Sequence, residues 1–321
     1  MKRASALLLL GLLTMAVVHF LTPVAPLRAL EHSSPATASV LLGEIRLPRT
    51  LLALGYGFVL GMTGAALQAL FGNPLASPDV TGSSSGAALG TVFAAYWLGV
   101  TEPLGLAAAG AGGAFLALAV MLALAGRRAE TTTMLLAGIA IALAAGAGTS
   151  LLLALAPSPF AFYDSFEWLM GSFVDRSLAQ AAVALVPAAL CCTFLVTRAR
   201  ALDLMALGED VVASLGYDPR RLALQVIVAA SIAVGTCVSV CGAIGFVGLL
   251  APYAARRLSG GHPGRALVPA GLIGGILLLV ADAAVRLGPP GRTIPVGILT
   301  TVAGTPLFLW LVVTMRRRVT S

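Results

Sequence analysis

The chain has 321 residues, of which 59% are hydrophobic and 10% are charged. A soluble domain has roughly 45–50% apolar and about 25% charged residues, so this composition excludes an ordinary water-soluble fold and indicates a membrane protein. The net charge of +7 comes almost entirely from arginines scattered between apolar runs, which membrane topology explains better than nucleic-acid binding. The single lysine is Lys2, and a phosphate-binding P-loop needs a lysine after its glycines, so the chain cannot be its own P-loop ATPase.

Apolar runs separated by arginine, proline and glycine follow one another along the whole chain. A helical membrane span takes roughly 20 apolar residues. We therefore predict an all-α, multi-pass membrane protein with about ten transmembrane helices in a single domain, residues 1–321. The expected spans are 5–25, 50–71, 82–99, 104–126, 132–156, 178–197, 222–241, 244–258, 266–286 and 295–315.

The basic residues set the expected orientation. An even number of spans puts both termini on one side, and if Lys2 and Arg3 are cytoplasmic, 14 of the 20 basic residues fall on the inner side. The positive-inside rule therefore predicts cytoplasmic N and C termini in a bacterial inner membrane. The first run could also be a cleaved signal peptide, but its apolar core, residues 4–21, exceeds the roughly 7–15 residues of a signal region, so we expect it to be retained.

Two residue types inside the spans favour helix packing over chemistry. Glycines recur at 57–61 and 271–275, a spacing that lets helix backbones approach closely within a bilayer. The four cysteines lack the paired spacing and histidine partners of a zinc site, so we expect them to act as small buried side chains and expect no metal site. They are Cys191, Cys192, Cys237 and Cys241.

Two constellations leave other function classes open. Asp282 and Arg286 stand four residues apart, a spacing that predicts a local ion pair, although a secondary carrier would use such an acid as a proton relay. The string from Gly82 to Gly86 matches the G-x-S-x-G of a serine hydrolase, with Ser84 as its nucleophile. That chemistry also needs a histidine base, and none of the three histidines stands in a recognisable catalytic context; they are His19, His32 and His262.

Two loops are more polar than topology requires. On the expected outer side, Arg46 and Arg49 flank a proline and offer guanidinium donors to carboxylates of an incoming partner. On the inner side, the loop from Arg198 to Arg221 is the longest, and residues 207–216 within it are typical of a short amphipathic helix that ends in glycine. A membrane protein without its own energy source needs such a surface for a cytoplasmic partner.

The motifs of the chain resemble those of one family, in the family's order, from about Arg46 to Trp310. The segments concerned are 46–49, 136–138, 168–172, 207–216, 242–249, 281–286 and 295–300, together with Gly64, Gln68, Asn73, Pro74 and the residues up to Asp79, Gly82, Ser85, Gly86 and Gly138. The chain is similar to the permease subunits of ABC importers for iron-siderophore complexes, haem and cobalamin, the FecCD family. It departs from the family's common residues at Tyr253, at 261–263 and at Thr293.

The resemblance implies a type II ABC importer permease fold. It also implies a dimer of permeases, for which we expect two copies of this chain although a related permease remains an alternative, with two cytoplasmic ATPase subunits and an external substrate-binding protein. Docking of the binding protein is expected at Arg46, Arg49 and Arg286. The residues expected to line the pathway or to pack its helices are Gly64, Gln68, Asn73, Pro74, Ser85, Gly86 and Gly138. Coupling to the ATPase is expected at Leu207, Gly208, Glu209, Asp210, Ser214, Leu215 and Gly216.

The function expected from this resemblance is transport and not enzymatic catalysis. The permease would pass a metal chelate across the membrane. A ferric siderophore is the first candidate because it is the commonest cargo in the family, and haem and cobalamin are also open. ATP and magnesium would bind the partner ATPase, so no cofactor is expected in this chain. Further alternatives are the secondary carrier that relies on Asp282 and the hydrolase that relies on Ser84.

Overall fold

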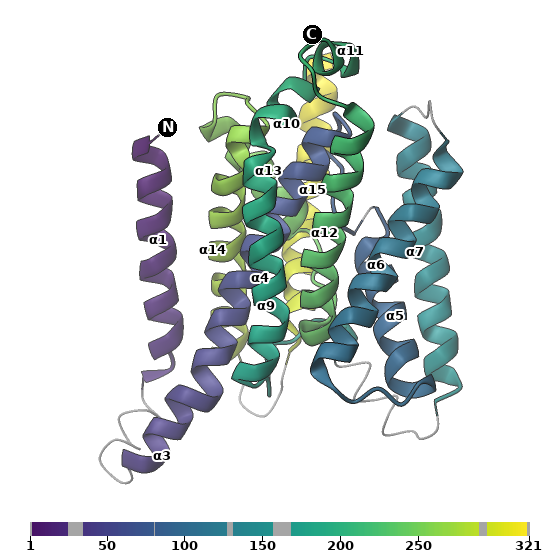
Figure 1. Cartoon of the computed structure of the whole chain (residues 1–321). Helices are drawn as coiled ribbons and strands as arrows, with labels where there is room; N and C mark the ends of the chain where they lie inside the picture. Colours follow the sequence, from purple (N-terminus) through teal and green to yellow (C-terminus); the bar gives the residue numbers. More distant parts are fainter. Residues whose placement is uncertain are drawn as a thin grey trace.

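The protein is a bundle of helices (Figure 1). The computed structural model describes residues 2–24, 35–79, 81–126, 131–156, 168–288 and 294–319, and these contain helices and no strand. A π-helical turn at Leu41–Arg46 and a 3-10 turn at Gly264–Ala266 precede α4 and α14. The helices are α1 Lys2–Leu21, α3 Pro35–Val40, α4 Leu47–Leu70, α5 Ser83–Trp97, α6 Pro103–Ala125, α7 Thr131–Ala154, α9 Leu178–Thr197, α10 Ala199–Met205, α11 Glu209–Ser214, α12 Pro219–Cys241, α13 Val247–Leu258, α14 Leu267–Arg286 and α15 Val296–Val319.

Each of the ten expected spans contains a helix, but not all of the helices have the length of a full span. Within the described residues, seven helical segments are long and apolar enough to cross a membrane. Two of the remaining helices, α5 with 15 residues and α13 with 12, are short because each follows a break in helical structure. The breaks lie between α4 and α5 and between α12 and α13.

The two ends of the bundle differ in charge. The helices α10 and α11 lie at one end, here called the inner end, together with the start of α1 and the end of α15, whereas α3 lies at the opposite, outer end (Figure 1). Arginines with described side chains are more numerous at the inner end, as the positive-inside rule requires. They are Arg198, Arg200, Arg220, Arg221, Arg256, Arg257 and Arg265, against Arg46, Arg49, Arg176 and Arg286 at the outer end.

Some residues of the sequence analysis lie outside the described part of the chain. These are Arg28, His32, Arg127, Arg128, Arg292 and Thr293, together with the side chains of residues 316–318.

The core of the bundle is formed by α4 and α12, which are largely buried, and α14 packs along α4. The approach of α4 to α14 is a contact between backbones. A Cβ atom at Gly57 would overlap the carbonyl oxygen of Gly274, and one at Gly61 would overlap that of Ala270. Small residues thus bring these helices together where lipid provides no hydrophobic drive for association, as the glycine spacing predicts. Cys192, Cys237 and Cys241 are also buried among the helices, as expected, and Cys191 is half-buried.

Candidate docking and coupling surfaces

A charged cluster at the outer end joins α1, α4 and α14. The carboxylate of Asp282, which is 1% exposed, accepts two hydrogen bonds from the Arg49 guanidinium, Nε to Oδ2 at 2.7 Å and Nη2 to Oδ1 at 2.9 Å. The Nε2 atom of His19 lies 2.8 Å from Oδ2 of the same carboxylate. A buried charge is tolerated only when it is paired and its remaining bonding capacity is used, and here both oxygen atoms have partners.

His19 is fully buried and uses both of its ring nitrogens. Its Nδ1 atom lies 2.8 Å from the hydroxyl oxygen of Thr50, and its Nε2 atom faces Asp282. Because an ionised carboxylate only accepts hydrogen bonds, Nε2 carries the proton in this pair. The sequence offered no context for this histidine, since its two partners are 31 and 263 residues away along the chain.

Two further arginines close the C-terminal end of α1. Arg286 donates to the carbonyl oxygen of His19 at 2.7 Å, and Arg46 donates to those of Leu21 at 2.8 Å and Pro23 at 2.7 Å. The last carbonyl groups of a helix have no partner within it, and arginine donors at this end satisfy them.

The local ion pair expected between Asp282 and Arg286 is wrong. The carboxylate of Asp282 binds Arg49 and His19 from neighbouring helices, and Arg286 turns to the end of α1. The physical reason is that the planar fork of Arg49 matches both carboxylate oxygens of Asp282 at once. Arg286, one turn further along the same helix, is instead occupied by a carbonyl group at the end of α1 that has no partner within its helix.

The three expected docking arginines differ in access. Arg46 is 3% exposed and is occupied by the end of α1, whereas the Arg49 side chain is 15% exposed. Arg49 borders an outer depression of about 250 Å³ that is also lined by Glu44, Asp175 and Arg176. Asp282 binds Nε and Nη2 of Arg49, which leaves Nη1 of the guanidinium as a donor for another group.

The expected coupling segment is a compact unit at the inner end. It consists of α10, a glycine turn and the short helix α11, with Gly208 at φ 105° before α11 and Gly216 at φ 85° after it. Both angles lie in the region that only glycine adopts readily, which explains why glycine stands at both ends. Val212 is fully buried and holds α11 against the protein, whereas Leu207 and Leu215 are exposed by 66% and 57%.

The remaining polar residues of the segment add little internal structure. The Ser214 hydroxyl donates to the Val211 carbonyl within α11, and Asp210 is exposed. Glu209 begins α11. The side chain of Glu209 lies outside the described part of the chain, and the segment presents the Leu207 and Leu215 side chains and the Asp210 carboxylate at its surface.

Sequence reasoning missed the residue that fixes this unit to the bundle. The Asp203 carboxylate on α10 accepts the backbone N–H of Gly264 at 2.8 Å, in the turn between α13 and α14. A Cβ atom at Gly264 would overlap the Ala199 carbonyl oxygen, so α10 lies directly against that turn. The coupling segment is thus connected to α13 and α14 by a charge-assisted hydrogen bond.

The motif residues between α4 and α5 build the first helix break. Asn73 closes the turn, since its side-chain oxygen accepts the Leu75 N–H at 2.9 Å, and Pro74 follows within the turn. Asp79 accepts the Ser84 hydroxyl at 2.8 Å and the backbone N–H of Phe246. Because Phe246 belongs to the second break, Asp79 connects the two breaks.

The bond from Ser84 to Asp79 bears on the hydrolase alternative. A serine nucleophile needs a histidine base within hydrogen-bond distance. Ser84 instead donates to a carboxylate, and the ring nitrogens of His19 are bound to Asp282 and Thr50. This arrangement does not support hydrolysis.

Most of the other motif residues allow close packing of helices, and one of them, Gln68, is buried without a side-chain hydrogen bond in the described part of the chain. A Cβ at Gly64 would overlap the Gly248 carbonyl oxygen, and one at Gly86 would lie 2.5 Å from the Gly113 carbonyl oxygen. Gly138 is buried on α7, and its carbonyl oxygen lies beside Gly82. Ser85 is half-buried on the first turn of α5. Gln68 is fully buried, and neither polar atom of its amide has a hydrogen-bond partner in the structure.

The described residues form a bundle of helices, seven of them long and apolar enough to cross a membrane, and comparison with known proteins defines the class as that of transport permeases. The model of the FecCD transport family matches residues 5–314, and the chain belongs to this family. The chain is 36% identical over 293 residues to the vitamin B12 import system permease protein BtuC of Citrobacter koseri, covering 88% of this chain and 85% of the relative. It is 35% identical to the protein of the same name from Vibrio cholerae, covering 96% and 93%.

A solved structure supports the same class. An inward-facing metal-chelate type ABC transporter matches 98% of this chain and 100% of its own, with a TM-score of 0.83 and 28% identity. The protein is therefore the permease subunit of an ABC importer of the metal-chelate and cobalamin type, resident in the inner membrane as a multi-pass protein. It is not itself an enzyme, because the ATPase of such an importer is a separate subunit.

Removal of the Asp282 carboxylate should destabilise the outer cluster. The variant Asp282→Ala leaves Arg49 and His19 buried without their acceptor, and we expect the free energy of unfolding to fall by about 3–5 kcal/mol. Thermal unfolding of the purified protein measures the effect. Glu44→Ala, which removes an exposed acid at the same end, should change stability by less than about 0.5 kcal/mol. Equal stability of the two variants would contradict the role given to the cluster.

Proposed function

We propose that this permease moves a metal chelate, with cobalamin as the first candidate cargo. The observation that carries the choice is the name of the relatives, since proteins 35% and 36% identical to most of this chain are named for vitamin B12 import. Among the candidate cargoes, cobalamin therefore ranks before the ferric siderophore that the family resemblance alone favours, and haem remains the third candidate. The cargo enters from the outer side, and ATP hydrolysis on the partner subunit drives the change between outward and inward access.

Transport in proteoliposomes tests the cargo. The chain would be reconstituted with its own ATPase and binding protein, and uptake of cobalamin, a ferric siderophore and haem would be measured with and without ATP. We expect ATP-dependent uptake of cobalamin alone. Uptake of only a siderophore or haem would overturn the cargo, and uptake without the ATPase would overturn the coupling and favour a secondary carrier that uses Asp282.

We further propose that the binding protein docks at the outer arginines, Arg46, Arg49 and Arg286. Arg49 is the expected direct contact because it borders the outer depression and has Nη1 available, whereas Arg46 and Arg286 fix the end of α1 beside it. Asp282 would then act as a positioning residue that holds the guanidinium in one orientation for an incoming carboxylate. Charged pairs of this kind set the orientation and rate of association.

Arg49→Gln should weaken binding of the substrate-binding protein about tenfold, because one charge-assisted contact is lost. Affinity for the reconstituted permease complex is the measurement, preceded by thermal unfolding to establish that the variant is folded. Glu44→Gln is the matched control, since it removes a charge from the same depression without removing a donor. An Arg49→Gln complex with unchanged affinity would exclude Arg49 as the contact.

We also propose that the segment from Leu207 to Gly216 seats in the ATPase dimer, and that two copies of this chain form the transport pathway. Support comes from the exposed leucines at 207 and 215, and from the hydrogen bond between Asp203 and Gly264, through which a displacement of α10 would reach the turn between α13 and α14. The helix α13 begins directly after the second helix break. A coupling segment that moved independently of the bundle could not transmit such a displacement.

Gly208→Val should reduce ATP-driven uptake by at least tenfold while the permease stays folded, because a β-branched residue cannot adopt φ 105° without strain and α11 would be misplaced. The measurement is the ratio of cargo transported to ATP hydrolysed. Gly99→Val is the matched control, since Gly99 also has a positive φ of 66° and open surroundings but lies in an outer loop. The same ratio in both variants would contradict the assignment of the coupling segment.

A further inference from the structure

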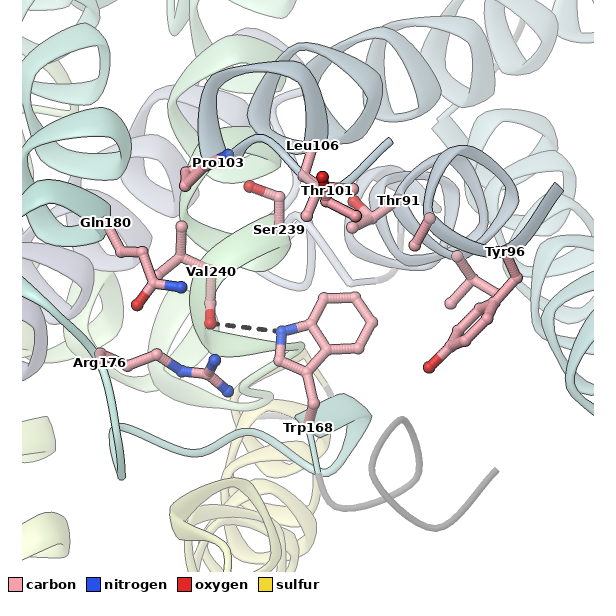
Figure 2. A pocket seen from close by; sticks show the side chains of 12 residues that line it. Thr91, Tyr96, Thr101, Pro103, Leu106, Trp168, Arg176, Gln180, Ser239 and Val240 are labelled. Carbon is pink, nitrogen blue, oxygen red and sulfur yellow. Dashed lines mark hydrogen bonds between the residues drawn. The ribbon is translucent and has the colours of Figure 1, made fainter. Parts of the chain in front are cut away.

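A second cavity at the outer end shares one lining residue, Arg176, with the depression beside Arg49. It has a volume of about 220 Å³ and lies where the end of α5, the start of α6, the start of α9 and the end of α12 meet. Figure 2 shows its polar side chains, with the Arg176 guanidinium directed toward Trp168. Sites that enclose a drug-sized ligand have roughly 300–1,000 Å³, so this cavity admits a small group and not a whole chelate.

The cavity contains the guanidinium group of Arg176, for which the described residues provide no ion-pair partner. The Nε atom of Arg176 is buried and has no hydrogen-bond partner, and no acid lines the cavity. In the described part of the chain, Arg176 forms no ion pair, although the exposed Asp175 precedes it. A buried donor without a partner costs free energy, and a charged one costs more. The side chain is therefore arranged for an anionic acceptor that comes from outside the chain.

A second donor stands beside the arginine. The side-chain oxygen of Gln180 is occupied, because it accepts the Ser177 N–H at 2.9 Å in the capping box of α9. Figure 2 shows the amide nitrogen of Gln180 on the side of Val240, within the cavity. Arg176 and Gln180 together present only donors, and such a set is suited to the oxygen atoms of a phosphate or carboxylate.

Two hydroxyl groups of the cavity, those of Thr91 and Ser239, present the opposite chemistry. The Thr91 hydroxyl donates to the Ala87 carbonyl at 2.9 Å, and the Ser239 hydroxyl donates to the Thr236 carbonyl at 2.8 Å. Since each hydroxyl has a single proton, both oxygens are left as acceptors. They match a ligand that carries hydroxyl donors next to its anionic group.

The remaining wall carries the side chains of Tyr96 and Thr101 and is otherwise apolar and aromatic. Its other members are Val92, Ala95, Pro103 and Leu106, together with the Trp168 ring, whose Nε1 atom donates to the Val240 carbonyl at 3.3 Å. Tryptophan and tyrosine are enriched at the level of lipid headgroups, and Tyr96 and Trp97 stand at the end of α5. The cavity thus combines an anion site, hydroxyl acceptors and an apolar wall at the depth where a phospholipid changes from headgroup to acyl chain.

We propose that this cavity binds the headgroup of an anionic phospholipid of the outer leaflet, of the phosphatidylglycerol type, with Arg176 and Gln180 on the phosphate and Thr91 and Ser239 facing the glycerol hydroxyls. The bound lipid joins the corner of α5 and α6 to the corner of α9 and α12. This inference depends on residence in the membrane and not on the identity of the cargo.

Lipid titration of the delipidated, detergent-purified chain tests the proposal. Phosphatidylglycerol should raise the midpoint of thermal unfolding of the unaltered protein at low concentration, and Arg176→Gln should need about tenfold more lipid for the same shift, because a hydrogen bond to a charged group is lost. Native mass spectrometry should show one lipid retained by the unaltered protein and lost from the variant. Arg220→Gln, an exposed arginine at the inner end, is the matched control and should behave as the unaltered protein does.

Three further arms make the outcome decisive. Phosphatidylcholine, which has no net charge, should act equally on all variants. Arg176→Lys, which keeps the charge but loses the planar fork, should fall between the unaltered protein and Arg176→Gln, and it replaces the latter if that variant does not fold. Equal responses of Arg176→Gln and the unaltered protein to phosphatidylglycerol would overturn the site. Inorganic phosphate that reproduces the full shift would overturn the assignment to lipid and leave a general oxyanion site.

Discussion

Direct contact between the backbones of α4 and its neighbours is the constraint on which the structure depends. Gly57 and Gly61 bring α4 against α14, and Gly64 brings it against α13. In a bilayer the lipid tails are as apolar as the helix surface, so association depends on such close packing and on polar contacts between helices. The outer cluster requires the same approach, because Arg49 on α4 reaches Asp282 only when α4 and α14 lie in contact.

The two helix breaks have a related origin. Backbone groups inside a membrane need partners, and a break is tolerated only where the protein provides them. Asn73 supplies one partner through its side chain, and Asp79, also in the first break, accepts Ser84 at the start of α5 and Phe246 of the second break. One carboxylate of the first break therefore accepts donors from two segments that are far apart in sequence, and the short helices α5 and α13 begin beside it.

The sequence was sufficient to predict the helical class, the approximate spans and the glycine packing, because hydropathy and small-residue spacing are local signals. It was insufficient for the polar contacts. Asp282 was assigned to Arg286, its neighbour along the helix, whereas its partners come from α1 and α4. The hydrogen bond between Asp203 and Gly264 and the position of the Arg176 Nε atom in a cavity also depend on how distant segments meet. No periodicity within a single segment carries that information. The length and pattern of the inner loop indicated a partner surface at residues 207–216, and the family resemblance named the ATPase as the expected partner.

The outer cluster also has a consequence for biosynthesis. His19 and Arg49 lie in the first two long helices, but their shared acceptor, Asp282, lies 263 and 233 residues further along the chain. A chain inserted in order from its N terminus carries these two basic groups without an acceptor until α14 has been made. The end of α1 likewise receives Arg286 only at that stage. The first helices to enter the bilayer are thus among the last to be completed, and a nascent chain that stops before α14 retains an uncompensated guanidinium in the membrane.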